Sequence, residues 1–176
     1  MKKRRGINFL PEDATYDEIN SPVGTLTIIT SLKGLHAVLW DNDRENKQCE
    51  KIINNLFQSK NEKTITQTKN QLNEYFQGKR KIFDLPLIIN GTDFQTQAWE
   101  QLIKIPYATT ITYAEQAERI GNKNKARAVG LANGLNPISI IIPCHRVIGS
   151  NGHLVGFGGG LEKKAFLLKL EQMKRY

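Results

Sequence analysis

The chain has 176 residues, of which 39% are hydrophobic, and a formal net charge of +8 at pH 7. This length and apolar content suffice for one ordinary domain or for two compact ones. The start Met1–Arg5 is basic, but the residues that follow are too acidic and too few for the apolar core of a signal peptide. No apolar run is long enough to span a membrane, so we expect a cytoplasmic protein.

The cysteines and histidines predict neither a disulfide framework nor a metal site. Cys49 and Cys144 could pair, but a chain of this size without a secretory signal usually keeps its thiols reduced. The histidines, at His36, His145 and His153, are scattered instead of standing at the short spacings of metal ligands. We therefore expect no metal and no cofactor.

The positive charge is concentrated in the C-terminal half. Residues 91–176 hold 11 Lys and Arg against 6 Asp and Glu. Residues 1–90 hold 14 against 11, and four of those 14 cations stand at positions 2–5. A basic half suits a polyanion such as nucleic acid, although an ordinary solvated face has the same composition.

The N-terminal half predicts a small mixed α/β unit. Residues 24–40 alternate and are rich in β-branched side chains, and Gly34 stands where a β-hairpin would turn. Apolar residues at helical spacing over 45–58 and again around 72–76 predict two helices. Three further residues of this half are interpreted as packing residues: His36, Trp40 and Cys49.

Polar, turn-prone segments near residue 90 divide the chain. We therefore expect two domains, over 1–90 and 91–176. Apolar residues then recur at helical spacing over 94–105, and Pro106 would end that helix because proline cannot continue it.

A helix-turn-helix is predicted next. Thr112 and Glu115 form a capping box that opens a first helix. Gly121 closes it, and a second helix covers 125–134. Small residues flank one long cation, Arg127, so this helix could approach a partner closely while the guanidinium projects, although tight helix packing uses small residues too. The small residues are Ala126, Ala128 and Gly130.

The β-branched apolar run at 138–142 predicts a buried strand that leads to Cys144. His145 and Arg146 follow the cysteine at once. A free thiol has a pKa of about 8.5, and neighbouring positive charge lowers it, which favours the nucleophilic thiolate. A Cys-His pair is also found in hydrolases, and a glycine-rich segment such as 156–160 is often a linker.

The longer sequence pattern from Asn136 to Gly160 points to a protein family with high specificity. It resembles the active-site signature of the methylated-DNA–protein-cysteine methyltransferases through Asn136-Pro137, the apolar run, Pro143-Cys144-His145-Arg146-Val147 and the glycine-rich segment 156–160. With Tyr113 and Glu171 in register, the resemblance covers residues 94–171 nearly continuously. It implies an α/β (α+β) fold, with a small N-terminal ribonuclease-H-like β-sheet domain and a C-terminal winged-helix or helix-turn-helix domain.

The resemblance also implies direct-reversal DNA repair. Cys144 would take the alkyl group irreversibly from O6-methylguanine, and from O4-methylthymine, in a single turnover. His145 would act as the base through a water molecule, and Glu171 would orient its imidazole. Tyr113 would supply a proton donor to the departing guanine, and Asn136 would hold the cysteine turn.

The implied partner is double-stranded DNA that carries O6-alkylguanine, with no obligate protein partner and a nucleoid association in a bacterium. Because O6 is hidden in a duplex, the nucleotide must rotate out, and Arg127 resembles the residue that fills the vacated space. The helix would lie in the minor groove. The implied DNA contacts are Lys125, Ala126, Arg127, Ala128 and Gly130, and the implied base contacts are Val147, Phe157, Gly158 and Gly159.

The sequence departs from the family pattern at two positions. Phe157 stands where many relatives have tyrosine, and Leu170 stands where a histidine often precedes the glutamate. Two other functions stay open: a non-catalytic DNA-binding module, which would not need Cys144, and a Cys-His hydrolase, which would turn over repeatedly.

Overall fold

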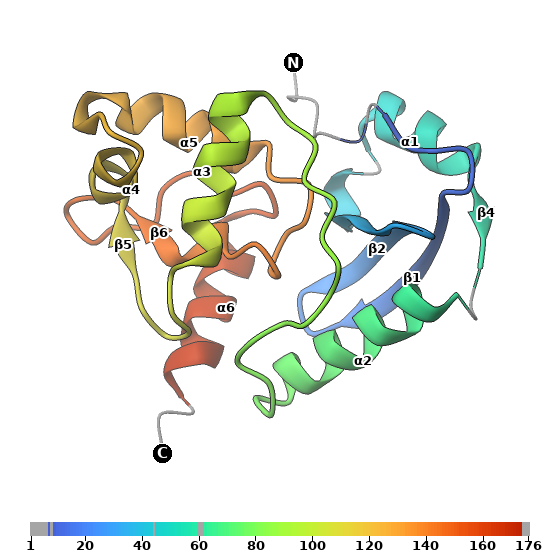
Figure 1. Ribbon diagram of the computed structural model, residues 1–176. Coiled ribbons are helices and arrows are strands. Elements are labelled where there is room, and N and C mark those ends of the chain that lie inside the picture. Colours follow the sequence, from blue (N-terminus) through green and yellow to red (C-terminus); the bar gives the residue numbers. More distant parts are fainter. Residues whose placement is uncertain (1–6, 8, 44, 60–61, 174–176) are drawn as a thin grey trace. The chain divides into compact units, whose positions relative to one another are not determined.

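The structure is a computed structural model that describes residues 7, 9–43, 45–59 and 62–173, so the basic start Met1–Arg5 lies outside it. The chain forms two compact units (Figure 1), Met1–Asn90 with Pro137–Ser139 and Gly91–Asn136 with Ile140–Tyr176. We expected 137–139 in the C-terminal domain. They group with the first unit because both Pro137 and Ser139 hydrogen-bond to the backbone of Val38, at 2.9 and 3.2 Å.

A four-stranded sheet in the order β3-β2-β1-β4 forms the centre of the first unit. The pairs β1–β2 and β2–β3 are antiparallel, and β4 runs parallel to β1. The predicted hairpin is confirmed, and Gly34 is needed in it because a Cβ there would lie 2.2 Å from the carbonyl oxygen of Pro86. The strands are β1 (Thr15–Ser21), β2 (Gly24–Ser31), β3 (Gly34–Trp40) and β4 (Phe57–Gln58).

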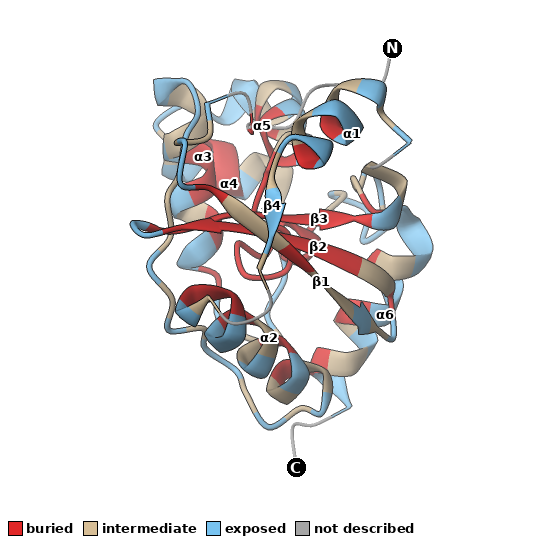
Figure 2. Ribbon diagram, turned by 90° about the vertical axis from the view of Figure 1, so that its right-hand side faces the viewer, coloured by how far each residue is buried: buried red, intermediate tan, exposed pale blue. Residues whose placement is uncertain are grey.

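Two helices cover the faces of this sheet, α1 (Lys47–Asn54) on one side and α2 (Lys63–Phe76) on the other (Figure 1). Figure 2 shows that β2 and β3 are mostly buried, whereas β1 is mostly half-buried and β4 is exposed. Cys49 and Ile53 of α1 pack with residues of β2 and β3. His36 and Trp40 are buried as well, as expected for packing residues.

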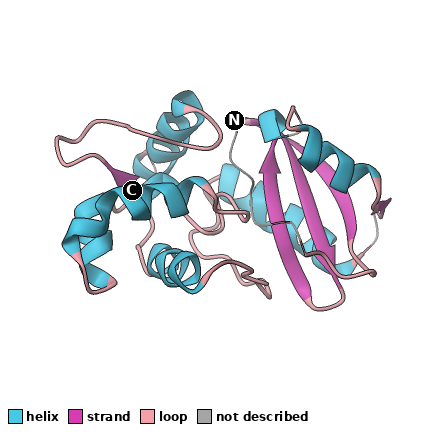
Figure 3. Cartoon of the chain, turned by 90° about the horizontal axis from the view of Figure 1, so that it is seen from above, coloured by secondary structure: helices cyan, strands magenta, loops and turns pink. Residues whose placement is uncertain are grey.

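The second unit is mainly helical, with long loops between its helices (Figure 3). Two short strands, β5 and β6, pair in parallel and connect the segment before the helix-turn-helix with the segment after Cys144. The elements are α3 (Asp93–Ile103), β5 (Ile111–Thr112), α4 (Tyr113–Arg119), α5 (Ala126–Gly134), β6 (Val147–Ile148) and α6 (Leu161–Gln172). The mixed α/β fold class with a small sheet domain and a helical domain is confirmed.

The helix-turn-helix forms as expected from α4 and α5. The Thr112 side chain accepts from the Glu115 backbone N–H at 3.1 Å, and the Glu115 carboxylate accepts from the Thr112 N–H at 2.6 Å, which completes the capping box. Gln116 and Asn133 then join the two helices through reciprocal amide hydrogen bonds of 3.1 and 2.7 Å. Helix α5 is therefore fixed to α4 by buried polar contacts as well as by packing.

The apolar run at 138–142 is buried as predicted, but it is not a strand. Ile138 forms one isolated bridge with Val38, and the chain then turns. Ile140 has a φ of +73°, which is rare for a β-branched residue and which a continuous strand does not allow. The apolar side chains of this run are explained by their burial. The backbone conformation is explained by the turn that leads to Cys144.

Candidate active site

Cys144 opens a short 3-10 helix, Cys144–Arg146, directly after Pro143 and is only 7% exposed. Asn136 holds this turn, since its amide nitrogen donates to the carbonyl oxygen of Ile142 at 2.8 Å and to the Cys144 sulfur at 3.4 Å. Neither Cys144 nor Cys49 is in a disulfide. The structure thus brings Asn136 and Cys144 together, as the sequence predicted.

His145 and Glu171 form a fully buried pair, with 2.8 Å between Nε2 and Oε1. Burial lowers the pKa of His145, so the imidazole is neutral near pH 7. Burial alone would raise the pKa of Glu171, but hydrogen bonds from His145 and Arg146, together with the charge of Arg146, outweigh it and lower that pKa to about 2. The ionised carboxylate accepts, so Nε2 of the neutral ring carries the hydrogen and Nδ1 carries the lone pair.

The lone pair on Nδ1 of His145 has no hydrogen-bond partner in the described part of the chain, although the atom is buried. A buried nitrogen that accepts no hydrogen bond is costly unless something else uses it. In this tautomer it is the one ring atom of His145 that could take a proton. The pair therefore leaves a basic nitrogen on His145, the residue that follows Cys144 in the sequence.

Arg146 points to Glu171, which the sequence did not predict. Its Nη2 and Nε lie 2.9 and 3.0 Å from the two carboxylate oxygens, and its Nη1 donates to the carbonyl oxygen of Ile105 at 2.7 Å. The backbone N–H of Ala108, in a left-handed conformation with φ +59°, donates to Glu171 at 3.0 Å. Arg146 is thus an anchor for the carboxylate that holds His145.

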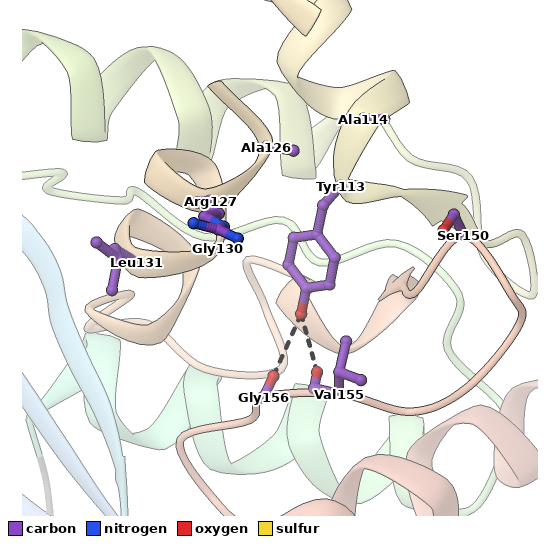
Figure 4. Close-up of a pocket in the computed structure, with 9 residues that line it drawn as sticks. All are labelled: Tyr113, Ala114, Ala126, Arg127, Gly130, Leu131, Ser150, Val155 and Gly156. Atoms are coloured by element: carbon purple, nitrogen blue, oxygen red, sulfur yellow. Dashed lines mark hydrogen bonds between the residues drawn. The ribbon is translucent and has the colours of Figure 1, made fainter. Parts of the chain in front are cut away.

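Tyr113 begins α4 and donates its hydroxyl to the carbonyl oxygens of Val155 and Gly156, at 3.0 and 3.3 Å (Figure 4). Burial raises the pKa of Tyr113 to about 12, and negative charge on Cys144 adds to this effect. The phenol therefore keeps its proton at neutral pH. Tyr113 lies where it can serve as a proton donor, and its hydroxyl also holds the loop 155–156.

Lys164 is a buried cation of the site that the sequence did not identify. Its ammonium donates to the carbonyl oxygens of Val147 and Val155, at 2.6 and 3.0 Å, and to the Tyr113 hydroxyl at 3.5 Å. Burial lowers its pKa to about 8, and negative charge on Cys144 opposes that shift. A positive charge in this position favours the thiolate form of Cys144.

Helix α6 explains why Lys164 was missed. In the sequence, Phe166, Leu167 and Leu170 stand at helical spacing and indicate the apolar face of an amphipathic helix. The fully buried residues are instead Lys164, Leu167 and Glu171, whereas Phe166 is 37% exposed. Leu167 is common to both sets, but the other two fully buried side chains are charged, so the hydrophobic pattern did not include them.

A cavity of about 600 Å³ opens between α4, α5 and the loop after β6 (Figure 4). Its walls are mostly small or apolar, and Arg127 supplies a cation. Of the predicted DNA contacts, Ala126, Arg127 and Gly130 line it, whereas Lys125 and Ala128 do not. The lining residues are Tyr113, Ala114, Ala126, Arg127, Gly130, Leu131, Ser150, Val155 and Gly156.

The predicted base contacts are placed less directly. Val147 is buried, and its carbonyl oxygen accepts from Lys164. Phe157 and Gly158 are half-buried and Gly159 is buried, beside the wall residue Gly156. The segment 157–159 thus follows directly after the cavity wall, but none of the four predicted base contacts lines the cavity.

Within the described ranges, no group of three or more His, Cys, Asp or Glu residues is arranged to hold a metal ion. The described helices include none that is both long and apolar enough to cross a bilayer.

Two sequence profiles match this chain. The profile described as the DNA binding domain of 6-O-methylguanine DNA methyltransferase matches residues 93–173. The profile described as the ribonuclease-like domain of the same protein matches residues 14–89. Together they cover most of the chain and confirm the predicted pair of domain types.

Individual relatives carry matching names. The methylated-DNA–protein-cysteine methyltransferase of Methanosarcina barkeri is 47% identical over 157 residues, which are 89% of this chain and 96% of that protein. The crystal structure of the O6-methylguanine methyltransferase of Mycobacterium tuberculosis has a TM-score of 0.82 and 40% identity, covering 93% of this chain and 95% of that one. A crystal structure of Mycobacterium tuberculosis OGT in complex with DNA has a TM-score of 0.81 and 41% identity, covering 90% and 93%.

Proposed function

We propose that this chain, which belongs to the 6-O-methylguanine DNA methyltransferase family, accepts the alkyl group of O6-alkylguanine on the sulfur of Cys144. Its activity is direct-reversal repair, in which a protein cysteine takes the methyl group from methylated DNA. The observation that supports the choice of residue is the buried chain Arg146–Glu171–His145, which holds Nε2 and leaves Nδ1 of His145, the residue after Cys144, as a basic nitrogen without a hydrogen-bond partner among the described residues. Asn136 holds the cysteine itself.

The chemical step is a displacement at the alkyl carbon. His145 Nδ1 takes the thiol proton through a water molecule, and the thiolate sulfur attacks the carbon while the carbon–O6 bond breaks. The electron pair of that bond goes to the purine, which takes up a proton and becomes guanine. Because the product at Cys144 is a thioether, which water does not cleave, each protein molecule acts once.

The departing guanine needs a proton donor, and Tyr113 is suited to that role. Its pKa of about 12 keeps it protonated, and its hydroxyl reaches the loop that borders the cavity. Lys164 lies within 3.5 Å of the same oxygen and can support its negative charge during donation. The bound base would replace the carbonyl oxygens of Val155 and Gly156 as the acceptor.

Access to the O6 atom requires that the nucleotide leave the duplex. Arg127 lies on α5 beside the cavity, and its guanidinium would fill the space that the nucleotide vacates. Gly158 and Gly159 would leave room for the alkyl group, and Phe157 would stack on the base. The proposed substrate is double-stranded DNA that carries O6-alkylguanine, and O4-methylthymine is a second substrate of the same site. The protein would act on this DNA in the cytoplasm.

Titration with a duplex that carries radiolabelled O6-methylguanine tests this proposal. Transfer should stop at one methyl group per protein molecule, because the thioether is stable. Cys144→Ser should abolish it, and Cys49→Ser, at the other buried cysteine, should leave it complete. Repeated turnover would indicate a hydrolase instead, and tight DNA binding without labelling would indicate a DNA-binding module.

A further inference from the structure

The solvent-facing side of α5 carries one side chain that the small-residue pattern does not explain. Leu131 is 52% exposed and follows Arg127 by four residues, which places both on the same face of the helix. Both line the cavity, and in Figure 4 Arg127 lies between Tyr113 and Leu131. In that view the leucine is thus separated by Arg127 from Tyr113, the proposed proton donor.

Leu131 is not needed for the core of its unit. The buried residues of α5 are Val129, Ala132 and Asn133, on the opposite side of the helix. Apart from Arg127, its neighbours on this face are small, since Ala128 stands three residues before it and Gly134 three residues after it, where a Cβ would meet nothing within 4 Å. A branched apolar side chain thus projects from a surface of small residues. Its exposure to water is unfavourable, and it contributes little apolar burial to folding.

The charges around this face indicate what covers it. Arg127 shares the cavity wall with Leu131, and Lys123 and Lys125 are exposed in the turn that precedes α5. A polyanion complements this set, and in the proposed function the polyanion is duplex DNA. Minor-groove proteins commonly insert apolar side chains, leucine among them, between or against base pairs beside their cations.

We infer that Leu131 is an apolar wedge that presses on the minor-groove edge of the base pair next to the lesion and makes repair depend on that pair. This inference rests on the proposed function. An A·T pair offers a groove floor without protruding groups, whereas G·C adds the polar exocyclic N2 amine of guanine. The leucine fits against the first, and it both clashes with the second and removes water from its amine.

The test uses duplexes that differ in the pair beside O6-methylguanine, on each side in turn: A·T, G·C or inosine·C, which lacks the exocyclic amine. Single-turnover transfer is measured against protein concentration, which separates binding from the limiting rate. The variants are Leu131→Ala and, as a control, Ile103→Ala, because Ile103 is 46% exposed at the end of α3 and does not line the cavity. Reaction with free O6-benzylguanine reports the chemistry alone.

On one side of the lesion, the unaltered protein should bind the A·T and inosine·C duplexes about fourfold more tightly than G·C, the effect of roughly one methylene removed from water. Leu131→Ala should lose this preference, whereas Ile103→Ala should keep both the preference and the rate with free O6-benzylguanine. A preference unchanged in Leu131→Ala, inosine·C behaving as G·C, or no preference in the unaltered protein would overturn the inference. Failure of the proposed function is distinct, because then no duplex would label Cys144.

Discussion

The buried carboxylate of Glu171 is neutralised by Arg146 and hydrogen-bonded to His145. Glu171 has a pKa of about 2 in the folded protein, below its ordinary value of 4.5, so its ionisation stabilises the fold above about pH 4.5. This contribution is lost as the pH falls from 4.5 to 2, and it is on the order of 3 kcal/mol. Glu171→Gln should therefore unfold more easily near neutral pH, because Arg146 stays buried without its partner.

Urea unfolding at about pH 6 and about pH 3 measures this effect. The unaltered protein should lose much more stability on acidification than Glu171→Gln does. Glu115→Gln is the matched control, since Glu115 is an exposed carboxylate that also accepts a backbone hydrogen bond. An equal acid response in all three proteins would show that Glu171 is not held in its ionised form.

Lys164 should affect the rate more strongly at neutral pH than at alkaline pH. With a pKa of about 8, its ammonium is charged at pH 7 and favours the thiolate of Cys144. Lys164→Met keeps the length of the side chain and removes the charge, so transfer to Cys144 near pH 7 should slow by about tenfold. The gap should narrow above about pH 8, where Lys164 is neutral and thiols begin to ionise unaided.

The rate with free O6-benzylguanine at a series of pH values measures this dependence, because it omits DNA binding. The folded pKa of Lys164 lies below its ordinary value of 10.5, so its charge costs stability below about pH 8, and stability rises as the pH increases toward 10.5. If Lys164→Met is slower than the unaltered protein by the same factor at every pH, Lys164 has only a structural role.

The predictability of each helix follows from how local its determinants are. The start of α4 could be predicted because Thr112 and Glu115, three residues apart, contain the whole capping box. The buried face of α6 could not, because Lys164 and Glu171 are buried through partners far away in the chain, Val147 and Arg146. A hydrophobic pattern has no signal for a buried charge that is satisfied by a distant residue.

The run at 138–142 shows a second limit of the same kind. Apolar, β-branched composition predicted burial correctly, but Ile140 turns with a positive φ that no local pattern encodes. Likewise, the sequence gives no indication that the Arg146 guanidinium points to Glu171, 25 residues further on. The family's active-site signature predicted which residues lie at the site. The orientation of their side chains could be seen only in the three-dimensional contacts.

The amide pair between α4 and α5 should be important for the position of α5, the helix that we propose to contact DNA. Gln116→Ala leaves the buried amide of Asn133 without its partner, which should cost about 2 kcal/mol in unfolding free energy. Replacing both by leucine should restore part of the stability, since two apolar groups need no hydrogen bond. Urea unfolding of both variants checks this, and a double variant less stable than Gln116→Ala would contradict it.

All the residues proposed for chemistry belong to the unit formed by 91–136 and 140–176. The sheet unit contains the other cysteine, Cys49, packed against β2 and β3. Both units match the same family, and the relatives align over nearly their full length, so the chain has the two-part organisation of those proteins. For the protein as a whole, we therefore expect that a single cysteine is consumed in a single event.

Peptide mass spectrometry after incubation with an O6-methylguanine duplex tests that claim most directly. We expect the peptide that contains Cys144 to gain one methyl group in step with the loss of O6-methylguanine, and the Cys49 peptide to stay unchanged. An unmodified Cys144 peptide in protein that has repaired its DNA, or more methyl groups removed than protein molecules present, would contradict the account.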